Sequence, residues 1–244
     1  MTLFLGTQIL LISIVFAIVW AIFHGLKHAF ESMQITSAAK RKLLAYTLIG
    51  VGCWLSILAA LALSGFFQNF DSFPPRLVSM AILPPVILTF VLLFSKPFYK
   101  ILLHIPPSWL VYVQSFRIVM EIFLWLGFVA GFVPPQMTFE WLNFDIVVGI
   151  TALMGGYTFF GRGRYRRFEA ILWNIFGIVL LFNIVLIALL SAPFAFRVFM
   201  NEPANTFVAY FPFIWVPGFI VPFAFAMHLF SLKQLFLNKK RVDQ

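Results

Sequence analysis

The sequence predicts an all-α, polytopic integral membrane protein that forms one domain over residues 1–244. Hydrophobic residues make up 62% of the chain, charged residues only 10%, and the mean hydropathy is +1.00. Soluble domains are about 45–50% apolar and about 25% charged, so this composition excludes a soluble domain. It also excludes a disordered chain, because disorder requires low hydrophobicity.

Seven windows are long and apolar enough for helices that cross a membrane, which takes about 20 residues. Each is continuously apolar, without the alternation of a barrel strand. Basic residues follow the first window rather than precede it, which argues against a cleavable signal peptide. The windows are Leu3–Phe23, Leu43–Phe66, Leu77–Phe94, Trp109–Phe132, Phe144–Phe160, Ala170–Ser191 and Phe211–Leu235.

Lys and Arg divide unequally between the two sides of these seven helices. Short loops rich in Lys and Arg stay cytoplasmic, so we expect an outer N-terminus and a cytoplasmic C-terminus in the cell (inner) membrane. The same loops account for the net charge of +9, which favours contact with anionic lipid head groups over nucleic acid. The basic side carries Lys27, Lys40, Arg41, Lys42, Lys96, Lys100, Arg162, Arg164, Arg166, Arg167, Lys233, Lys239, Lys240 and Arg241, and the other side Arg76 and Arg197.

The fourth window contains charged residues near its middle. Gln114, Arg117 and Glu121 are spaced i, i+3, i+7 and share one helical face. Arg117 and Glu121 are four residues apart, close enough to pair. A charge at the bilayer midplane costs about 2.5–3.5 kcal/mol. We therefore expect a ligand-binding group here, and the alternative is a pair that only fixes the helix register.

The fifth and sixth windows add further candidate ligand contacts. Glu140 and Asp145 flank the outer end of the fifth window. They form either a hydrated rim or, for Asp145, part of a vestibule that leads to Arg117. Asn174 and Asn183 lie on opposite faces of the sixth window. Such amides either bridge neighbouring helices or contact a ligand.

Interior prolines mark the third and seventh windows. Each one removes a backbone donor, kinks its helix and frees carbonyl groups. Neighbouring helices or water must satisfy these carbonyls, which is typical of a packing site or a cavity wall. We expect the two helices to act as gates through Pro84, Pro85, Pro217 and Pro222.

The two proline-containing windows also resemble each other. A Phe-Pro pair stands ten residues before an interior proline in both: Phe73-Pro74 before Pro84, and Phe211-Pro212 before Pro222. This spacing suggests a weak parallel repeat of residues 1–100 and 140–240 around the fourth helix, as in some transporters.

Four histidines lie on the predicted cytoplasmic side or in the inner half of a window: His24, His28, His104 and His228. The i, i+4 spacing of His24 and His28 suits a shared metal. No carboxylate or thiolate is in step with them in the sequence. We expect no cofactor, and a metal or haem held by these histidines is the alternative.

The sequence contains no motif for an enzyme nucleophile or a phosphate-binding loop, so no catalytic residue is predicted. We expect a membrane protein that binds or transports a small polar or anionic ligand around Arg117 and Glu121. One alternative is a receptor or accessory subunit that docks a membrane-protein partner through its basic cytoplasmic face. Another is a metalloenzyme built on the histidines.

Overall fold

The computed structural model describes residues 2–33 and 35–242, and side chains up to residue 237. The side chains of Lys239, Lys240 and Arg241 therefore lie outside the described residues. Across the described chain the secondary structure is helical, without strands. Within these described ranges, six helices are long and apolar enough to cross a membrane. The predicted class of helical membrane protein is thus supported.

The helices that cross the bundle include continuous and composite ones. The continuous ones are α1 (Thr2–Ser32), α2 (Ser37–Leu63), α7 (Asp145–Phe160) and α8 (Arg167–Ser191). The composite ones are η2 (Leu77–Ile82) with α3 (Leu83–Phe94), α5 (Pro107–Tyr112) with η3 (Val113–Ser115) and α6 (Phe116–Val129), and η7 (Val216–Ile220) with α9 (Val221–Val242). Shorter elements are η1 (Phe66–Gln68), α4 (Lys96–Leu102), η4 (Pro135–Met137), η5 (Gly161–Gly163) and η6 (Phe207–Ala209).

One of the seven predicted spans is short. Helix α7 has 16 residues, or about 24 Å at 1.5 Å per residue, against a hydrocarbon core of about 30 Å. It is apolar but lies below the length of the six candidate spans. The segment that precedes it is folded and buried, since Thr138 and Asn143 are both 0% exposed. Non-helical backbone at membrane depth is tolerated where protein covers it.

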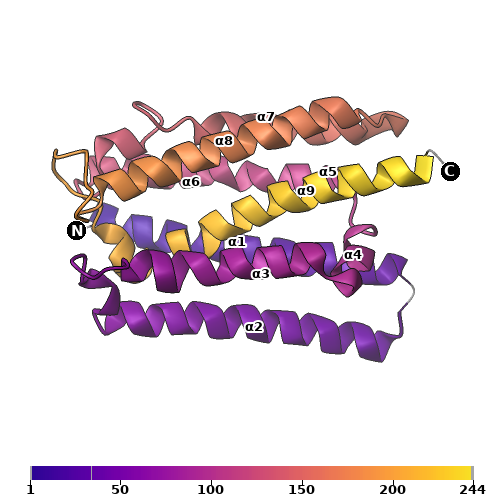
Figure 1. Cartoon of the computed structure of the whole chain (residues 1–244), viewed down its shortest axis with the longest axis horizontal. Helices are drawn as coiled ribbons and strands as arrows, with labels where there is room; N and C mark the ends of the chain where they lie inside the picture. The colour runs from indigo at the N-terminus through magenta and orange to yellow at the C-terminus, as the bar shows by residue number, and fades with distance from the viewer. Residues whose placement is uncertain (1, 34, 243–244) are drawn as a thin grey trace.

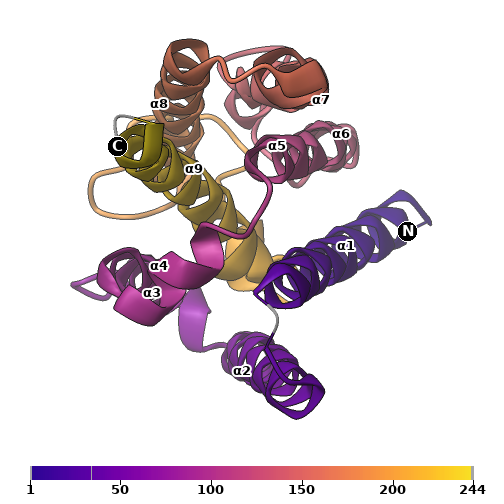
Figure 2. The same ribbon diagram turned by 90° about the vertical axis from the view of Figure 1, so that its right-hand side faces the viewer.

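Helix α9 lies in the middle of the bundle (Figures 1 and 2). It packs against α3, α5 and α8, while α1 packs on α6 and α2, and α7 packs on α5, α6 and α8. The central position explains why the α9 window is 61% buried, whereas that of α2 is only 11% buried. Polar side chains on α9 are therefore enclosed by protein.

Local sequence explains where several helices begin. Thr36 precedes α2, and its side chain accepts a hydrogen bond from the Ala39 N–H. Ser95 does the same for α4 through the Phe98 N–H, with Pro97 in the first turn. These are the residue types that satisfy free N–H groups at helix starts.

A wide helical turn directly precedes each of α3 and α9. In η2 and η7 the hydrogen bonds span five residues, as from the Leu83 N–H to the Val78 carbonyl. The two turns contact each other, and each stands just before an interior proline. Pro222 has no N–H for the Gly218 carbonyl four residues earlier. Trp54 Nε1 of α2 donates to that carbonyl instead, at 2.8 Å.

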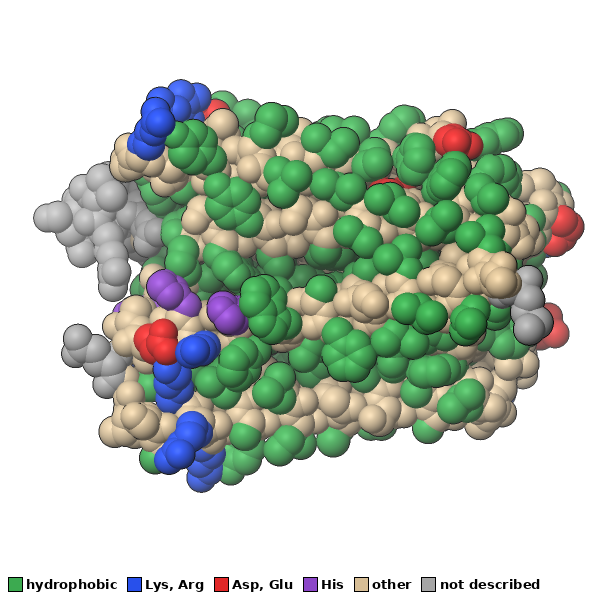
Figure 3. Space-filling model, turned by 180° about the vertical axis from the view of Figure 1, so that it is seen from behind, with side chains coloured by type: hydrophobic (Ala, Val, Ile, Leu, Met, Phe, Trp, Pro, Cys, Tyr) green, Lys and Arg blue, Asp and Glu red, His purple; other side chains and the backbone are tan. Residues whose placement is uncertain are grey.

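Charged side chains gather at the two ends of the molecule, with an apolar belt between them (Figure 3). We call the end formed by residues 35–36, 95–106 and 161–166 the basic end, because the lysines and arginines of these loops and their flanks lie there. An apolar belt between polar ends is what a bilayer requires.

Candidate ligand-binding site

The predicted polar face of the fourth window is buried. Gln114, Arg117 and Glu121 are 0%, 1% and 2% exposed. They lie on η3 and α6, where one short 3₁₀ turn interrupts the helix. The expectation that these side chains face inward is therefore confirmed.

The ion-pair partner of Arg117 is Asp145. Arg117 Nη1 lies 3.4 Å from Asp145 Oδ1 and donates to the Gly177 carbonyl at 3.4 Å. Within the described residues no ion pair joins Arg117 to Glu121, so the predicted pairing was wrong. The hydrated rim is also wrong for Asp145, which is 6% exposed. Helix α7 begins at this residue and directs it inward, while Glu140 accepts a hydrogen bond from Trp125 Nε1.

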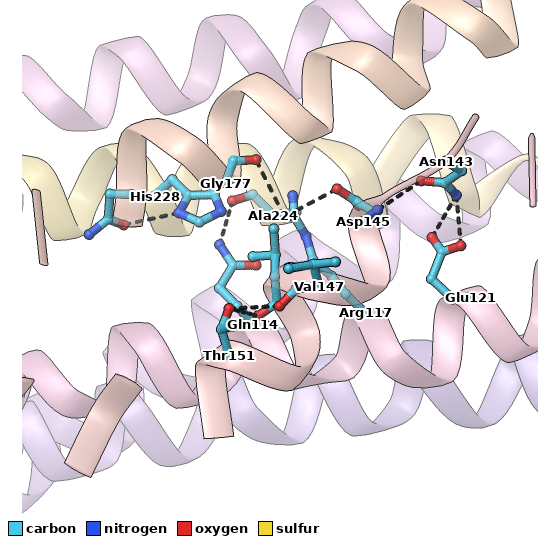
Figure 4. A network of polar contacts seen from close by, with 12 residues as sticks. Gln114, Arg117, Glu121, Asn143, Asp145, Val147, Thr151, Gly177, Ala224 and His228 are labelled. Atoms are coloured by element: carbon cyan, nitrogen blue, oxygen red, sulfur yellow. Dashed lines mark hydrogen bonds and ion pairs between the residues drawn. The ribbon is translucent and has the colours of Figure 1, made fainter. Parts of the chain in front are cut away.

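Asn143 connects the Glu121 carboxyl group to the backbone of Asp145 (Figure 4). Its Nδ2 is 2.7 Å from both Oε atoms of Glu121 and 3.0 Å from the Met137 carbonyl. Its Oδ1 accepts the Asp145 N–H at 3.1 Å. Sequence reasoning missed Asn143, because a neutral side chain in a loop gives no periodic signal. Structurally, it binds the Glu121 carboxyl group and the backbone N–H at which α7 begins.

A cavity lies beside these charges. Arg117, Glu121, Asp145 and Asn205 contribute its polar lining, and the rest of the wall is apolar, mainly from η2, α6, α8, η7 and the start of α9. It offers ≈ 90 Å³ to the centres of water-sized molecules. A single water needs about 10–15 Å³ by this measure, so the cavity has room for several waters or a small organic molecule.

Seven buried polar atoms around the cavity and α9 have no hydrogen-bond partner among the described residues. They are Gln114 Oε1, Arg117 Nε, Arg117 Nη2, Asp145 Oδ1, Asn205 Oδ1, His228 Nε2 and Gln234 Oε1. Gln114 reaches in from η3, with its Nε2 donating to the Ala224 carbonyl at 3.0 Å. Buried polar groups are nearly always paired, so such a cluster indicates a bound ligand, ion or water.

Buried polar residues continue along α9 toward the basic end. His228, Ser231 and Gln234 are at most 2% exposed and lie at i, i+3, i+6. Asn174 of α8 joins the first two, with its Oδ1 3.0 Å from His228 Nδ1 and its Nδ2 donating to Ser231 Oγ at 3.0 Å. Gln234 Nε2 donates to the Leu102 carbonyl at 2.6 Å. The polar groups thus extend from Arg117 to the connection between α4 and α5.

The remaining predicted residues separate into two groups. Asn174 belongs to the buried polar set, whereas Asn183 is half-buried and donates to the Leu142 carbonyl at 2.8 Å. Pro217 lines the cavity beside Arg117. Pro84, Pro85 and Pro222 line a second cavity instead. The prolines are therefore distributed over two cavities.

The four histidines are not brought together. The ring of His24 lies 4.4 Å from that of Trp20, and His104 Nδ1 lies 2.8 Å from the Lys100 carbonyl. His228 alone is in the core. Over the part of the chain that the structure describes, no group of three or more His, Cys, Asp or Glu residues is placed to hold a metal ion.

Comparison with known proteins identifies a family for the chain. No curated protein and no solved structure matches the chain. Residues 74–236 match a family described as a domain of unknown function (DUF8737). The matched region contains Arg117, Asp145 and His228, and it covers more than half of the chain. The chain therefore belongs to the DUF8737 family.

Proposed function

We propose that this protein binds or transports a small anionic ligand at Arg117, in the interior of a membrane. The observation that carries the proposal is the buried guanidinium at the cavity wall. Arg117 is 1% exposed, and its Nε and Nη2 have no hydrogen-bond partner in the described chain. Two adjacent N–H donors with a positive charge suit a carboxylate or a similar anion.

The carboxyl groups that line the cavity restrict how an anion can bind at Arg117. Asp145 and Glu121 are both close to Arg117, so an anion there faces two carboxyl groups. Like charges at such distances are unfavourable in a low-dielectric interior. We therefore propose that the anion enters together with a proton, which one of the carboxyl groups holds. The apolar remainder of the wall favours a ligand with a short hydrocarbon body, such as a short-chain carboxylic acid.

We also propose the finer topology: seven spans with α7 as the short fifth one, an outer N-terminus and a cytoplasmic C-terminus, in the cell (inner) membrane. The support is the excess of Lys and Arg at one end of the molecule. In a Cys53→Ser background, impermeant maleimide on intact cells should label Asp71→Cys and spare Arg164→Cys. The reverse pattern would invert the orientation.

The binding proposal is tested with three probes of matched size: butyrate, butyramide and butylammonium. The purified protein is heated in detergent with each, since a ligand that binds the folded state raises the unfolding temperature. Butyrate should stabilise more than butyramide, and butylammonium should have no effect. Lower pH should increase the butyrate effect, because binding is proposed to take up a proton.

A paired variant separates binding from folding. Arg117→Gln with Asp145→Asn removes both members of the ion pair, so no lone charge of the pair stays buried. This variant should fold and lose the butyrate response. Arg164→Gln, at an exposed arginine of the basic end, should keep it. A full response in the double variant, or stronger binding of butylammonium, would contradict the proposal.

A further inference from the structure

A second, larger cavity lies in the half of the bundle near the basic end, and residues of α1, α2, α3, α4, α5 and α9 line it. Its volume is ≈ 630 Å³, within the range of about 300–1,000 Å³ that is usual for small-molecule sites. The wall is almost entirely apolar and includes Trp54, Trp109, Phe98 and Phe230. Among the described residues, its lining shares no member with the cavity at Arg117.

Hydrogen bonds attach one half of α2 to the segment around Gly218, and cavity-lining residues of the other half are exposed. Trp54 Nε1 donates to the Gly218 carbonyl at 2.8 Å, and Trp215 Nε1 donates to the Leu55 carbonyl at 3.0 Å. Toward the basic end, lining residues of α2 and of α3 are exposed at the surface of the molecule. Leu43 of α2 is 41% exposed and Leu88 of α3 is 56% exposed. The cavity therefore opens sideways, where a membrane would place lipid chains.

The end of this cavity at the basic end is positively charged. Lysines stand next to lining residues on three helices: Lys27 after Leu26 on α1, Lys42 before Leu43 on α2, and Lys96 between Ser95 and Pro97 at α4. Lys233 adds a fourth charge, with its Nζ 5.9 Å from the centre of the Phe94 ring. Glu31, four residues after Lys27 on α1, is paired with Lys40.

We propose that this cavity binds an acyl chain of an anionic phospholipid, whose phosphate lies at Lys27, Lys42 and Lys96. The long apolar wall accounts for the chain, the lateral opening for entry from the bilayer, and the lysines for the charge of the head group. Trp54, hydrogen-bonded to Gly218, closes the far end. This site is independent of the function proposed at Arg117.

Native mass spectrometry of the detergent-purified protein tests the proposal directly. The protein is offered palmitoyl-oleoyl phosphatidylglycerol or the phosphatidylcholine with the same chains. Phosphatidylglycerol should be retained several-fold more. Lys42→Gln with Lys96→Gln should remove this preference, and Arg162→Gln with Arg164→Gln, elsewhere at the basic end, should leave it unchanged.

Two glycines of α2 provide a matched pair of variants. A Cβ on Gly50 or on Gly52 meets no atom within 4 Å among the described residues, and both positions are exposed. Gly50 lines the cavity and Gly52 does not. Gly50→Phe should therefore lose lipid several-fold and Gly52→Phe should retain it. Unfolding temperatures verify that both variants fold.

Three results would overturn the proposal. One is equal phosphatidylglycerol retention by Gly50→Phe and Gly52→Phe. Another is a head-group preference that the lysine substitutions do not change. The third is a dimer that Gly50→Phe converts to a monomer, which would assign the cavity to a second copy of the chain. Butyrate binding reports on the other cavity, so failure of one proposal leaves the other separately measurable.

Discussion

The Cα atom of Gly177 lies directly against the imidazole ring of His228. A Cβ at Gly177 would overlap the Cε1 and Nε2 atoms of that ring. The carbonyl of the same glycine accepts a hydrogen bond from Arg117 Nη1 at 3.4 Å. One residue on α8 thus sets both the approach of α9 and a contact of the buried guanidinium.

Replacing Gly177 should disturb the site through this contact. Gly177→Ala forces a methyl group into the imidazole ring, and overpacking of this kind costs about 1–3 kcal/mol. We expect a lower free energy of unfolding and a weaker butyrate response. Gly52→Ala is the control, because its Cβ meets open space and alanine favours a helix by about 0.5–1 kcal/mol. Equal stability of the two variants would contradict the close packing.

The pairing of Arg117 with Asp145 predicts a coupling energy. Arg117→Gln or Asp145→Asn alone leaves a buried charge without its partner, which costs about 3–5 kcal/mol. The double variant should lose less than the sum of the two single losses. Arg117→Gln combined with Glu121→Gln should be closer to additive. Unfolding of all five variants in mixed micelles measures both cycles, and stronger coupling to Glu121 would reverse our assignment.

Asn143 should be more important than its neutral charge suggests. Asn143→Ala removes the amide that donates to Glu121, and hydrogen bonds to charged groups contribute about 1.5–3 kcal/mol. Asn183→Ala removes one bond of a half-buried amide, for which about 0.5–1.5 kcal/mol is expected. Unfolding free energies should therefore rank Asn143→Ala as the less stable variant. The opposite order would show that Glu121 does not depend on this amide.

Trp54→Phe tests how the carbonyl before Pro222 is satisfied. The variant keeps an aromatic ring but leaves the Gly218 carbonyl without the indole donor, at a cost of about 1–3 kcal/mol. Trp20→Phe serves as the comparison, since Trp20 is 62% exposed. Thermal unfolding should show a clear loss for Trp54→Phe and little change for Trp20→Phe. Similar unfolding temperatures would rule out a structural role for the bond.

The burial of Gln114, Arg117 and Glu121 was predictable because helical periodicity is a local property of the sequence. The ion-pair partner of Arg117, Asp145, was not predictable in this way. Residues four apart on a helix are neighbours, but Asn143 and Asp145 fold against α6 from another segment and take the contacts of both charges. Which contact forms is decided by tertiary packing, and a single sequence gives no direct measure of it.

The sequence interpretation of His228 as a candidate metal ligand beside three other histidines differs from its place in the structure. Its structural neighbours are Asn174 and Gly177. The spacing of His228, Ser231 and Gln234 within an apolar window was the available signal. The parallel repeat of residues 1–100 and 140–240 stays a prediction, although wide turns do occur at corresponding places, in η2 and η7.

The two indole hydrogen bonds at Trp54 and Leu55 make α2 a helix with one fixed half. Ser37 lies 18 residues from Leu55, or about 27 Å along the helix axis. Tilting α2 by one degree about Leu55 therefore moves Ser37 by about 0.5 Å. Because Leu43, Thr47 and Gly50 of the half that contains Ser37 line the second cavity, such a tilt would change the width of the cavity. Such a tilt would let the proposed lipid site accept acyl chains of different thickness without moving Arg117, which is not among its lining residues.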